Sequence, residues 1–310
     1  MPPRPRRRPP AKTSTSRAAK PSAKAASKRT VSATDLFSDL VEDSVEHGKF
    51  LMLYSEAGEG KTTLAGQFPA PLFITTAGEQ GASIYKQSGK LQAGTRVIKL
   101  DALFPHSEIP NGTGHPGWNK CMETLSRFLT GKHDHKTVVI DSTSGLQDLC
   151  FQHGASMLYE GKMDDEEFTG YFRGYAKSAE CYWSGVFLPL CLQIVAAGYN
   201  VILIAHSTLR DVTNPTGPDF EQYRPALMKS VWEYTKKDLH GIFYLGREVN
   251  VQIDAKTKKK KTMGDRRFVG FQPSTYYIAK SWVTDSETEE LDAGSNERET
   301  YKSLAKLLSI

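Results

Sequence analysis

The segment from Ser55 to Thr63, SEAGEGKTT, combines glycines, a lysine and a hydroxyl side chain at a spacing that can bind phosphate. It matches the pattern G-x-x-x-x-G-K-[ST] at Gly60, Lys61 and Thr62, and departs from it where Ser55 replaces the first glycine. Glycine lets main-chain amides turn toward an anion, lysine places a cation on the outer phosphates, and threonine offers a hydroxyl to Mg²⁺. We expect these residues to bind the nucleotide: Ser55, Glu56, Ala57, Gly58, Glu59, Gly60, Lys61, Thr62 and Thr63.

The alternative is a glycine-rich turn that happens to contain Lys-Thr, and the surrounding sequence argues against it. The apolar run 49–54 precedes the segment and a helical pattern at 61–68 follows it. Strand, loop and helix therefore come in the order that directs a helix N-terminus at a bound anion. Within the loop, Glu56 and Glu59 are expected to face solvent.

An acid that can complete such a site is Asp141, which follows the β-branched run 137–140, TVVI. A carboxylate at a strand end can hold the shell of an Mg²⁺ ion whose other ligand is Thr62, so we expect ATP to bind with Mg²⁺. The alternative is that Asp141 only caps the helix expected at 144–159.

Hydrolysis of ATP also needs a group that orients or deprotonates water. Glu79 follows the apolar run 71–75, and His206 follows the run 201–205, so both should lie where strands end and ligands bind in such folds. We expect Glu79 to be the catalytic acid and His206 to touch the γ-phosphate or the attacking water, with Lys61 as the third catalytic residue. The alternatives are a solvated loop glutamate and a histidine that only satisfies a hydrogen bond.

The elements that position these residues can be read from the hydrophobic pattern. Compact apolar runs alternate with helical patterns, which predicts an α/β fold with a mostly parallel sheet. The expected strands are 49–54, 71–75, 95–100, 137–140 and 201–205, and the expected helices are 61–68, 117–130, 144–159 and 166–198.

After Ser207 the pattern changes to a polar stretch and then to shorter elements. We expect a helix near 226–238 and C-terminal antiparallel hairpins at the sheet edge, built from strand-like runs at 241–253, 267–271 and 275–279. An acidic, loop-like segment at 284–297 and a closing helix at 299–308 complete the chain. The expected domains are a disordered basic tail (1–34), a nucleotide-binding domain (35–283) and an acidic linker with a C-terminal helix (284–310).

The charge of the chain is unevenly distributed. The first 34 residues hold ten of the 40 basic residues and none of the 35 acidic ones, so the remainder has 30 basic against 35 acidic residues. This division excludes nucleic-acid binding by the bulk charge of the folded part. The tail either binds polyanions or only adds solubility.

Other features of the sequence bear on location. No window of 18 uninterrupted apolar residues occurs, and the basic N-terminus lacks the apolar core of a secretory signal, so we expect a cytoplasmic protein without membrane spans. The four cysteines form no C-x-x-C pair and are expected to be buried thiols in a reducing compartment. His133 and His135 are expected to be exposed in a loop and not to bind metal.

The chain resembles RecA-like P-loop ATPases, most closely the phage-encoded nucleotide-binding ATPases that include single-strand-annealing recombination proteins. The resemblance covers roughly 48–282 and rests on five segments: Ser55–Thr63, Phe73–Gly81, Val138–Ser142, Ile202–Ser207 and Tyr277–Lys280. It implies a sheet in which another strand lies between the phosphate-loop strand and the strand that ends in Asp141. It also implies assembly into a ring or filament, ATP near the subunit interfaces and single-stranded DNA as partner, in the host cytoplasm for a phage-encoded protein.

The resemblance also assigns roles to single residues. The catalytic glutamate of the family maps to Glu79 and its sensor position to His206. The family's basic Ala-Lys-x-Arg element corresponds to Ala279-Lys280-Ser281-Trp282, which lacks the arginine. Lys280 is the candidate for contact with a neighbouring subunit's nucleotide.

Contacts to DNA are expected from a basic cluster between two strand-like runs, because such a cluster would lie at a hairpin tip and attract phosphates without regard to sequence. The alternative is a solvated turn that protects a strand edge. The acidic segment 160–167 argues against DNA contact at that loop. The candidate residues are Lys256, Lys258, Lys259, Lys260, Lys261, Arg266 and Arg267.

These patterns favour an ATP-hydrolysing protein that acts on DNA in recombination, annealing or replication. A nucleotide-dependent assembly protein or switch that does not hydrolyse ATP is the alternative, which gains if Glu79 is not catalytic. A small-molecule kinase fits less well, because the arginines that would clamp phosphates, Arg173 and Arg210, are isolated.

Overall fold

The computed structural model describes residues 47–253, 260–282, 290–293 and 296–308. The expected basic tail at 1–34 lies outside the described residues, as do the candidate DNA contacts Lys256, Lys258 and Lys259. The described elements belong to one compact unit, Val45–Ile310.

The described strands are β1 (Phe50–Ser55), β2 (Pro71–Thr75), β3 (Arg96–Lys99), β4 (Thr137–Asp141), β5 (Asn200–Val212), β6 (Phe220–Pro225), β7 (Gly241–Ile253), β8 (Lys260–Gly270), β9 (Lys280–Ser281) and β10 (Glu290–Asp292). The described α-helices are α1 (Lys61–Ala65), α2 (Gly81–Gln87), α3 (Pro116–Thr130), α4 (Thr143–Leu158), α5 (Glu166–Thr169), α6 (Arg173–Ser178), α7 (Leu188–Ala196), α8 (Lys229–Asp238) and α9 (Glu297–Leu308). Short 3₁₀ turns lie at His106–Glu108 and Gly170–Phe172, and a π-helix at Ala179–Phe187.

The sheet has the order β10-β8-β7-β1-β5-β4-β2-β3, and the strands from β7 to β3 along this path are parallel. This arrangement confirms the predicted α/β fold with a mostly parallel sheet. Strand β5 lies between β1 and β4, as the family resemblance implies. Strands covered on both faces are buried throughout, which is why β1, β2 and β4 read as continuous apolar runs.

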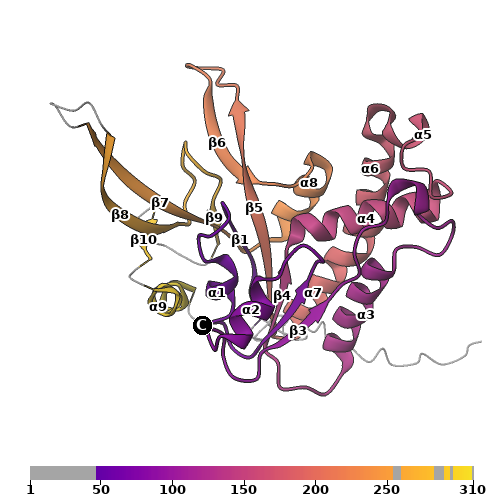
Figure 1. The fold of residues 1–310 in the computed structure, drawn as a ribbon, viewed down its shortest axis with the longest axis horizontal. Coiled ribbons are helices and arrows are strands. Elements are labelled where there is room, and N and C mark those ends of the chain that lie inside the picture. The colour runs from indigo at the N-terminus through magenta and orange to yellow at the C-terminus, as the bar shows by residue number, and fades with distance from the viewer. Residues whose placement is uncertain (1–46, 254–259, 283–289, 294–295, 309–310) are drawn as a thin grey trace, which may run out of the picture. The chain divides into compact units, whose positions relative to one another are not determined.

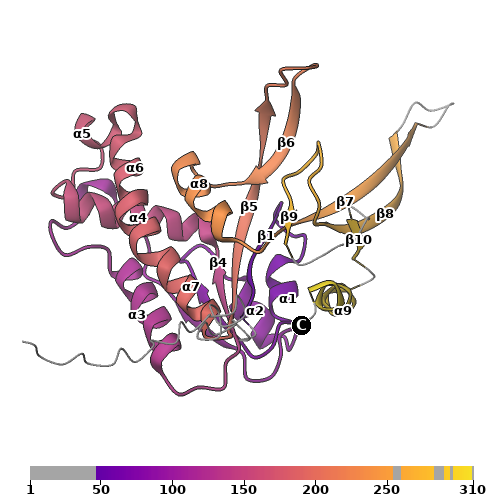
Figure 2. The same cartoon turned by 180° about the vertical axis from the view of Figure 1, so that it is seen from behind.

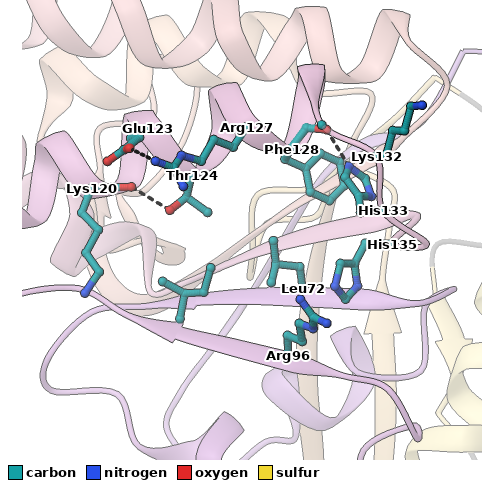
Figure 3. A pocket seen from close by; sticks show the side chains of 12 residues that line it. Leu72, Arg96, Lys120, Glu123, Thr124, Arg127, Phe128, Lys132, His133 and His135 are labelled. Atoms are coloured by element: carbon teal, nitrogen blue, oxygen red, sulfur yellow. Dashed lines mark hydrogen bonds and ion pairs between the residues drawn. The ribbon is translucent and has the colours of Figure 1, made fainter.

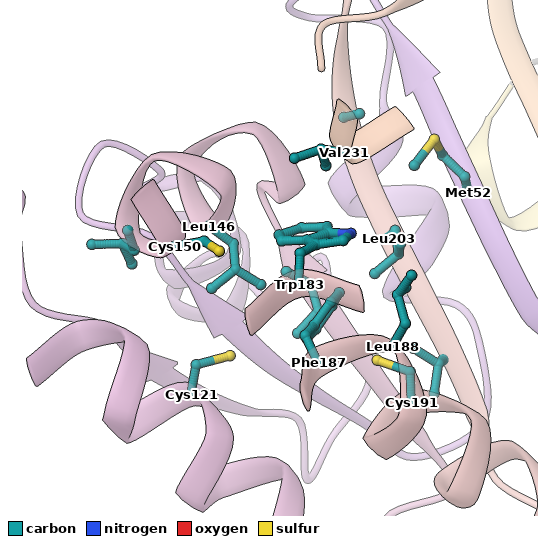
Figure 4. Close-up of a cluster of buried hydrophobic side chains, with 14 of the residues drawn as sticks. Met52, Cys121, Leu146, Cys150, Trp183, Phe187, Leu188, Cys191, Leu203 and Val231 are labelled. Atoms are coloured by element: carbon teal, nitrogen blue, oxygen red, sulfur yellow. The ribbon is translucent and has the colours of Figure 1, made fainter. Parts of the chain in front are cut away.

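Helices cover both faces of the sheet (Figures 1 and 2). Alternate residues of β1 point to opposite sides: Phe50 and Met52 belong to the core shared with α3, α4 and α7, whereas Leu51 and Leu53 belong to the core shared with α1 and α9. The first core contains Trp183 with the buried thiols Cys121, Cys150 and Cys191 (Figure 4). Cys181 is half-buried.

Two antiparallel hairpins extend from the sheet, one in the C-terminal region where hairpins were expected and one in a region where none was expected. The β7–β8 hairpin confirms the predicted pairing after residue 241. The other is formed by β5, which continues to Val212 and pairs with β6 in the region predicted as a polar stretch (Figure 1). Its half-exposed strands carry no apolar alternation, so the pattern did not indicate them. The run 275–279, predicted as a strand, forms only one bridge, between Tyr277 and Tyr223.

The longest helical stretch, Glu166–Ala196, is long and apolar enough to cross a membrane by length and composition alone. It is interrupted at Tyr171 and Phe172, whose φ angles are 52° and 57°. Beyond the interruption, Trp183 and Phe187 are fully buried in the core. We therefore interpret this stretch as helices that pack against the sheet.

Candidate nucleotide-binding site

The predicted phosphate loop connects β1 to α1, as the strand–loop–helix pattern requires. Gly58 and Gly60 have φ angles of 89° and 87°, a left-handed conformation that side chains with a Cβ rarely adopt. Gly60 is the N-cap of α1 and no side chain caps this helix, so its first amides are available to a bound anion.

The Lys61 ammonium lies inside the loop and holds its carbonyl groups together. Its Nζ donates to Ser55 O over 3.0 Å, to Ser55 Oγ over 3.1 Å and to Glu56 O over 2.7 Å. Burial lowers the pKa of Lys61, and the nearby acids, Asp141 foremost, oppose this. Ser55, the departure from the phosphate-loop pattern, thus contributes a second oxygen to the lysine.

Thr62 and Asp141 meet directly. Thr62 Oγ1 donates a hydrogen bond to Asp141 Oδ2 over 2.9 Å, and Asp141 is only 2% exposed. Burial, and then the charge of Glu79, raise the pKa of Asp141 to about 6. The side chain that caps α4 is Ser142, which accepts from Gly145 N, so Asp141 is not the helix cap that the alternative reading required.

Glu79 and His206 form a second pair beside Asp141. Nε2 of His206 lies 2.8 Å from Oε1 of Glu79, and both side chains are half-buried. The hydrogen bond from His206 lowers the pKa of Glu79, and the Ser142 hydroxyl and Lys61 act in the same direction. Glu79 is therefore a carboxylate at neutral pH, suited to accept a hydrogen bond from water.

The strand register explains why these distant residues converge. Ser55 pairs with His206 across β1 and β5, and Thr75 pairs with Asp141 across β2 and β4. All four strands are parallel neighbours, so their carboxyl ends meet at one edge of the sheet, and the loop after β2 brings Glu79 to the same place.

The structure corrects the expected exposure of Glu59. Its Oε2 accepts from Arg247 Nε over 3.3 Å, and its side chain is 20% exposed. Glu56, in contrast, is exposed as expected.

The two arginines of the predicted basic cluster lie within the β7–β8 ladder and not at its tip. Arg267 donates to Glu59 O over 3.3 Å and pairs with Glu297 over 3.4 Å, which places it beside the phosphate loop. Arg266, which opposes Glu248 across the ladder, pairs with Glu248 and Glu290. Lys260 and Lys261 belong to β8, and nothing is described of their side chains.

Lys280, the expected contact to a neighbouring nucleotide, is engaged within its own subunit. Its Nζ donates to Lys236 O over 3.0 Å at the end of α8, and it lies 3.6 Å from the centre of the Trp282 ring. It pairs with Ile242, near the amino end of β7, whereas the phosphate loop follows the carboxyl end of β1.

The sequence reasoning missed residues that support the acids. Thr76 N donates to Asp141 O over 2.9 Å, and Thr76 Oγ1 accepts from Ser142 N over 3.4 Å. A Cβ on Gly145 would come within 2.5 Å of Thr76 Oγ1, so α4 can approach only with glycine there. The Thr-Thr pair at 75–76 and the Ser-x-x-Gly spacing after Asp141 were the available signals.

A separate cavity of about 630 Å³ lies between α3 and the first residues of β2 and β3 (Figure 3). Leu72 and Arg96 line it at the amino ends of their strands, the opposite sheet edge from Asp141. His133, expected to be exposed, is half-buried here, with Nε2 donating to Phe128 O over 2.6 Å. This cavity shares no lining residue with the nucleotide site.

The sequence over residues 47–282 matches the family model described as the AAA domain. The chain belongs to the AAA domain family. Among solved structures, the flagellar accessory protein FlaH from Methanocaldococcus jannaschii matches this AAA domain over 79% of this chain and 84% of its own, at 12% identity and a TM-score of 0.34. No curated protein matches the sequence.

The described residues of this AAA domain suit a nucleotide with Mg²⁺. Hard oxygen donors from Thr62 and Asp141 lie together, and the ammonium of Lys61, the first residue of α1, contacts the loop that precedes the helix. The structure and the family membership together identify a nucleotide-binding domain of the P-loop ATPase type.

Proposed function

We propose that this AAA domain binds ATP with Mg²⁺ in the phosphate loop and hydrolyses it to ADP and phosphate. The observation that carries the proposal is the hydrogen bond from Thr62 to Asp141 beside the Glu79–His206 pair. It puts metal-binding oxygens and a water-orienting carboxylate at one sheet edge. When bound, Mg²⁺ neutralises charge on the phosphate oxygens.

Each residue has a defined task in this proposal. Lys61 exchanges loop carbonyls for phosphate oxygens, since its hydrogen bonds to Ser55 and Glu56 are those that an anion would replace. Glu79, held ionised by His206, accepts a proton of the attacking water and orients it. His206 holds Glu79 in position through the hydrogen bond between them. Because His206 lies on β5, a change in this bond is passed to β5 and to the hairpin that continues it.

We further propose that ATP hydrolysis serves single-stranded DNA in recombination, annealing or replication, in a ring or filament and in the cytoplasm, which is the host cytoplasm for a phage-encoded protein. The resemblance to phage annealing ATPases supports this assignment. The β5–β6 hairpin, which continues directly from His206 and carries the exposed Arg210, is the described feature that can pass a DNA contact to the site.

The test is the ATPase rate with and without single-stranded DNA, together with the mass of the particle with and without ATP. We expect stimulation by DNA and assembly with ATP. Hydrolysis without stimulation would contradict the DNA assignment. Tight ATP binding without turnover would favour the alternative, a nucleotide-dependent assembly protein. That alternative has one observation in its favour, because the lowered pKa of Glu79 weakens it as a base.

A further inference from the structure

A cavity of about 830 Å³ lies beside the phosphate loop, on the face of the sheet that α1 covers. Gly58, Gly60 and Thr63 are among the residues that line it. Among the described residues, its lining includes neither Asp141 nor the Glu79–His206 pair. Gly60 and Thr63, which line this cavity, flank Lys61 and Thr62 in the sequence, so a ligand whose phosphates reach Thr62 can extend its other end into the cavity.

The cavity walls come from three elements that the core holds in place: α1, the segment from α2 to the turn before β3, and α9. Gln92 fixes the turn by donating to Gln67 O over 2.7 Å and to Phe68 O over 3.1 Å. The remaining lining residues are Tyr85, Gly89, Lys90, Leu91, Asn296, Glu297, Arg298, Tyr301 and Lys302.

Helix α9 is tied to the phosphate loop at one end and buried at the other. Arg267 joins Glu59 O to Glu297, the first residue of the helix, and a Cβ on Gly60 would come within 3.0 Å of the Glu297 carboxylate. Leu304 and Leu308 are fully buried. The helix is thus a fixed wall, although it lies beyond residue 282, where the family match ends.

The lining has the chemistry of a site for an aromatic base with a polar sugar. Tyr85 and Tyr301 each offer a half-exposed ring, and Tyr301 is held by an edge contact to Phe68 with 5.0 Å between ring centres. Planar bases stack on such rings, and Lys90, which lies 5.4 Å from the centre of the Tyr85 ring, adds positive charge near it.

We propose that this cavity binds the base and ribose of the nucleoside triphosphate, and that the C-terminal helix α9 supplies one of its walls. The inference rests on the proposed function and deepens it, since it makes the C-terminal segment part of the nucleotide site. Tyr85 and Tyr301 are the residues that contact the base.

The experiment compares the affinities of the full-length chain for ATP and for inorganic tripolyphosphate, which has the phosphates without base or ribose, by titration calorimetry. We expect the unaltered protein to bind ATP more tightly than tripolyphosphate. Tyr85→Ala and Tyr301→Ala should each weaken ATP binding about tenfold, the size of one lost stacking contact. Both variants should bind tripolyphosphate within about twofold of the unaltered protein. Tyr301→Phe keeps the ring and should keep ATP affinity.

Tyr171→Ala, which removes an exposed tyrosine outside this cavity and away from the phosphate loop, is the matched control and should bind both ligands normally. Equal affinity of the unaltered protein for both ligands would overturn the inference and leave the proposed function standing. A parallel loss of both ligands in Tyr85→Ala and Tyr301→Ala would assign the rings a structural role and also overturn it. Binding of neither ligand by the unaltered protein would overturn the proposed function as well.

Discussion

The hydroxyl of Thr62 lies 2.9 Å from the carboxylate of Asp141, although 79 positions separate the two residues in the sequence. Thr62 lies in the first turn of α1, which follows the phosphate loop, and Asp141 ends β4, which lies two places from β1 in the sheet. Because both oxygens can bind the same Mg²⁺, the contact makes the phosphate loop and the acid one site.

Lys61→Ala is expected to lower ATP affinity by about 100-fold or more. The ammonium makes charge-assisted hydrogen bonds, each worth about 1.5–3 kcal/mol, and several phosphate oxygens would lose them. Equilibrium binding of a fluorescent ATP analogue measures the effect. Lys120→Ala, at the separate cavity near α3, is the control and should bind normally. Tight binding of the ATP analogue by Lys61→Ala would contradict the assignment of this loop as the phosphate-binding loop.

Asp141 makes stability depend on pH. Its pKa in the folded protein is raised from 3.8 to about 6, so the side chain stabilises the fold when protonated. This contribution is fully present below about pH 4 and is lost as the pH rises through about 6. Asp141→Asn cannot ionise, so in metal-free buffer the variant should be more stable than the unaltered protein above pH 7, by on the order of 3 kcal/mol.

Urea unfolding at pH 5 and pH 8 measures this difference, which should grow with pH. Exposed Asp134→Asn is the control and should not change the pH dependence. An identical pH dependence for Asp141→Asn and the unaltered protein would contradict the buried, proton-sensitive role of Asp141.

Asp141→Asn should also remove the tightening of ATP binding by Mg²⁺, because an amide is a poorer metal ligand than a carboxylate.

Glu79→Gln is expected to lower kcat for ATP hydrolysis about 1,000-fold while leaving ATP affinity within about threefold. The amide keeps the shape and the proximity to His206 but cannot accept a proton from water. Steady-state phosphate release measures kcat, with the exposed Glu123→Gln as a matched control. Unchanged turnover would show that another group orients the water, and would leave the fold and the nucleotide site intact.

The parallel core and the residues at its strand ends could be predicted because they depend on local pattern. Continuous apolar runs identified β1, β2 and β4, and parallel strands necessarily bring the ends that carry Ser55 and Asp141 to one edge. Glu79 and His206 were placed by the same rule, and the structure adds the hydrogen bond between them.

Contacts between polar residues that lie far apart in the sequence leave no pattern of apolar runs. The sequence analysis placed Arg267 in a basic cluster at a hairpin tip. In the structure β8 begins at Lys260 and not at Arg267, so Arg267 lies within the ladder of β7 and β8, beside the phosphate loop. The β5–β6 hairpin was missed because its strands are half-exposed and polar, and the role of α9 could not be seen because its partner Leu64 lies more than 200 residues away.

Arg267→Ala is expected to lower ATP affinity about fivefold to thirtyfold without loss of the fold. The guanidinium joins Glu59 O in the phosphate loop to Glu297 at the start of α9, and one or two charge-assisted hydrogen bonds would be lost. Amide hydrogen exchange should become faster in the first turn of α9 and in the loop. Arg266→Ala is the matched control: it neighbours Arg267 on β8 but pairs with Glu248 and Glu290, so it should leave ATP affinity and α9 exchange unchanged. Normal ATP affinity together with normal exchange in Arg267→Ala would show that the C-terminal helix is held without this link.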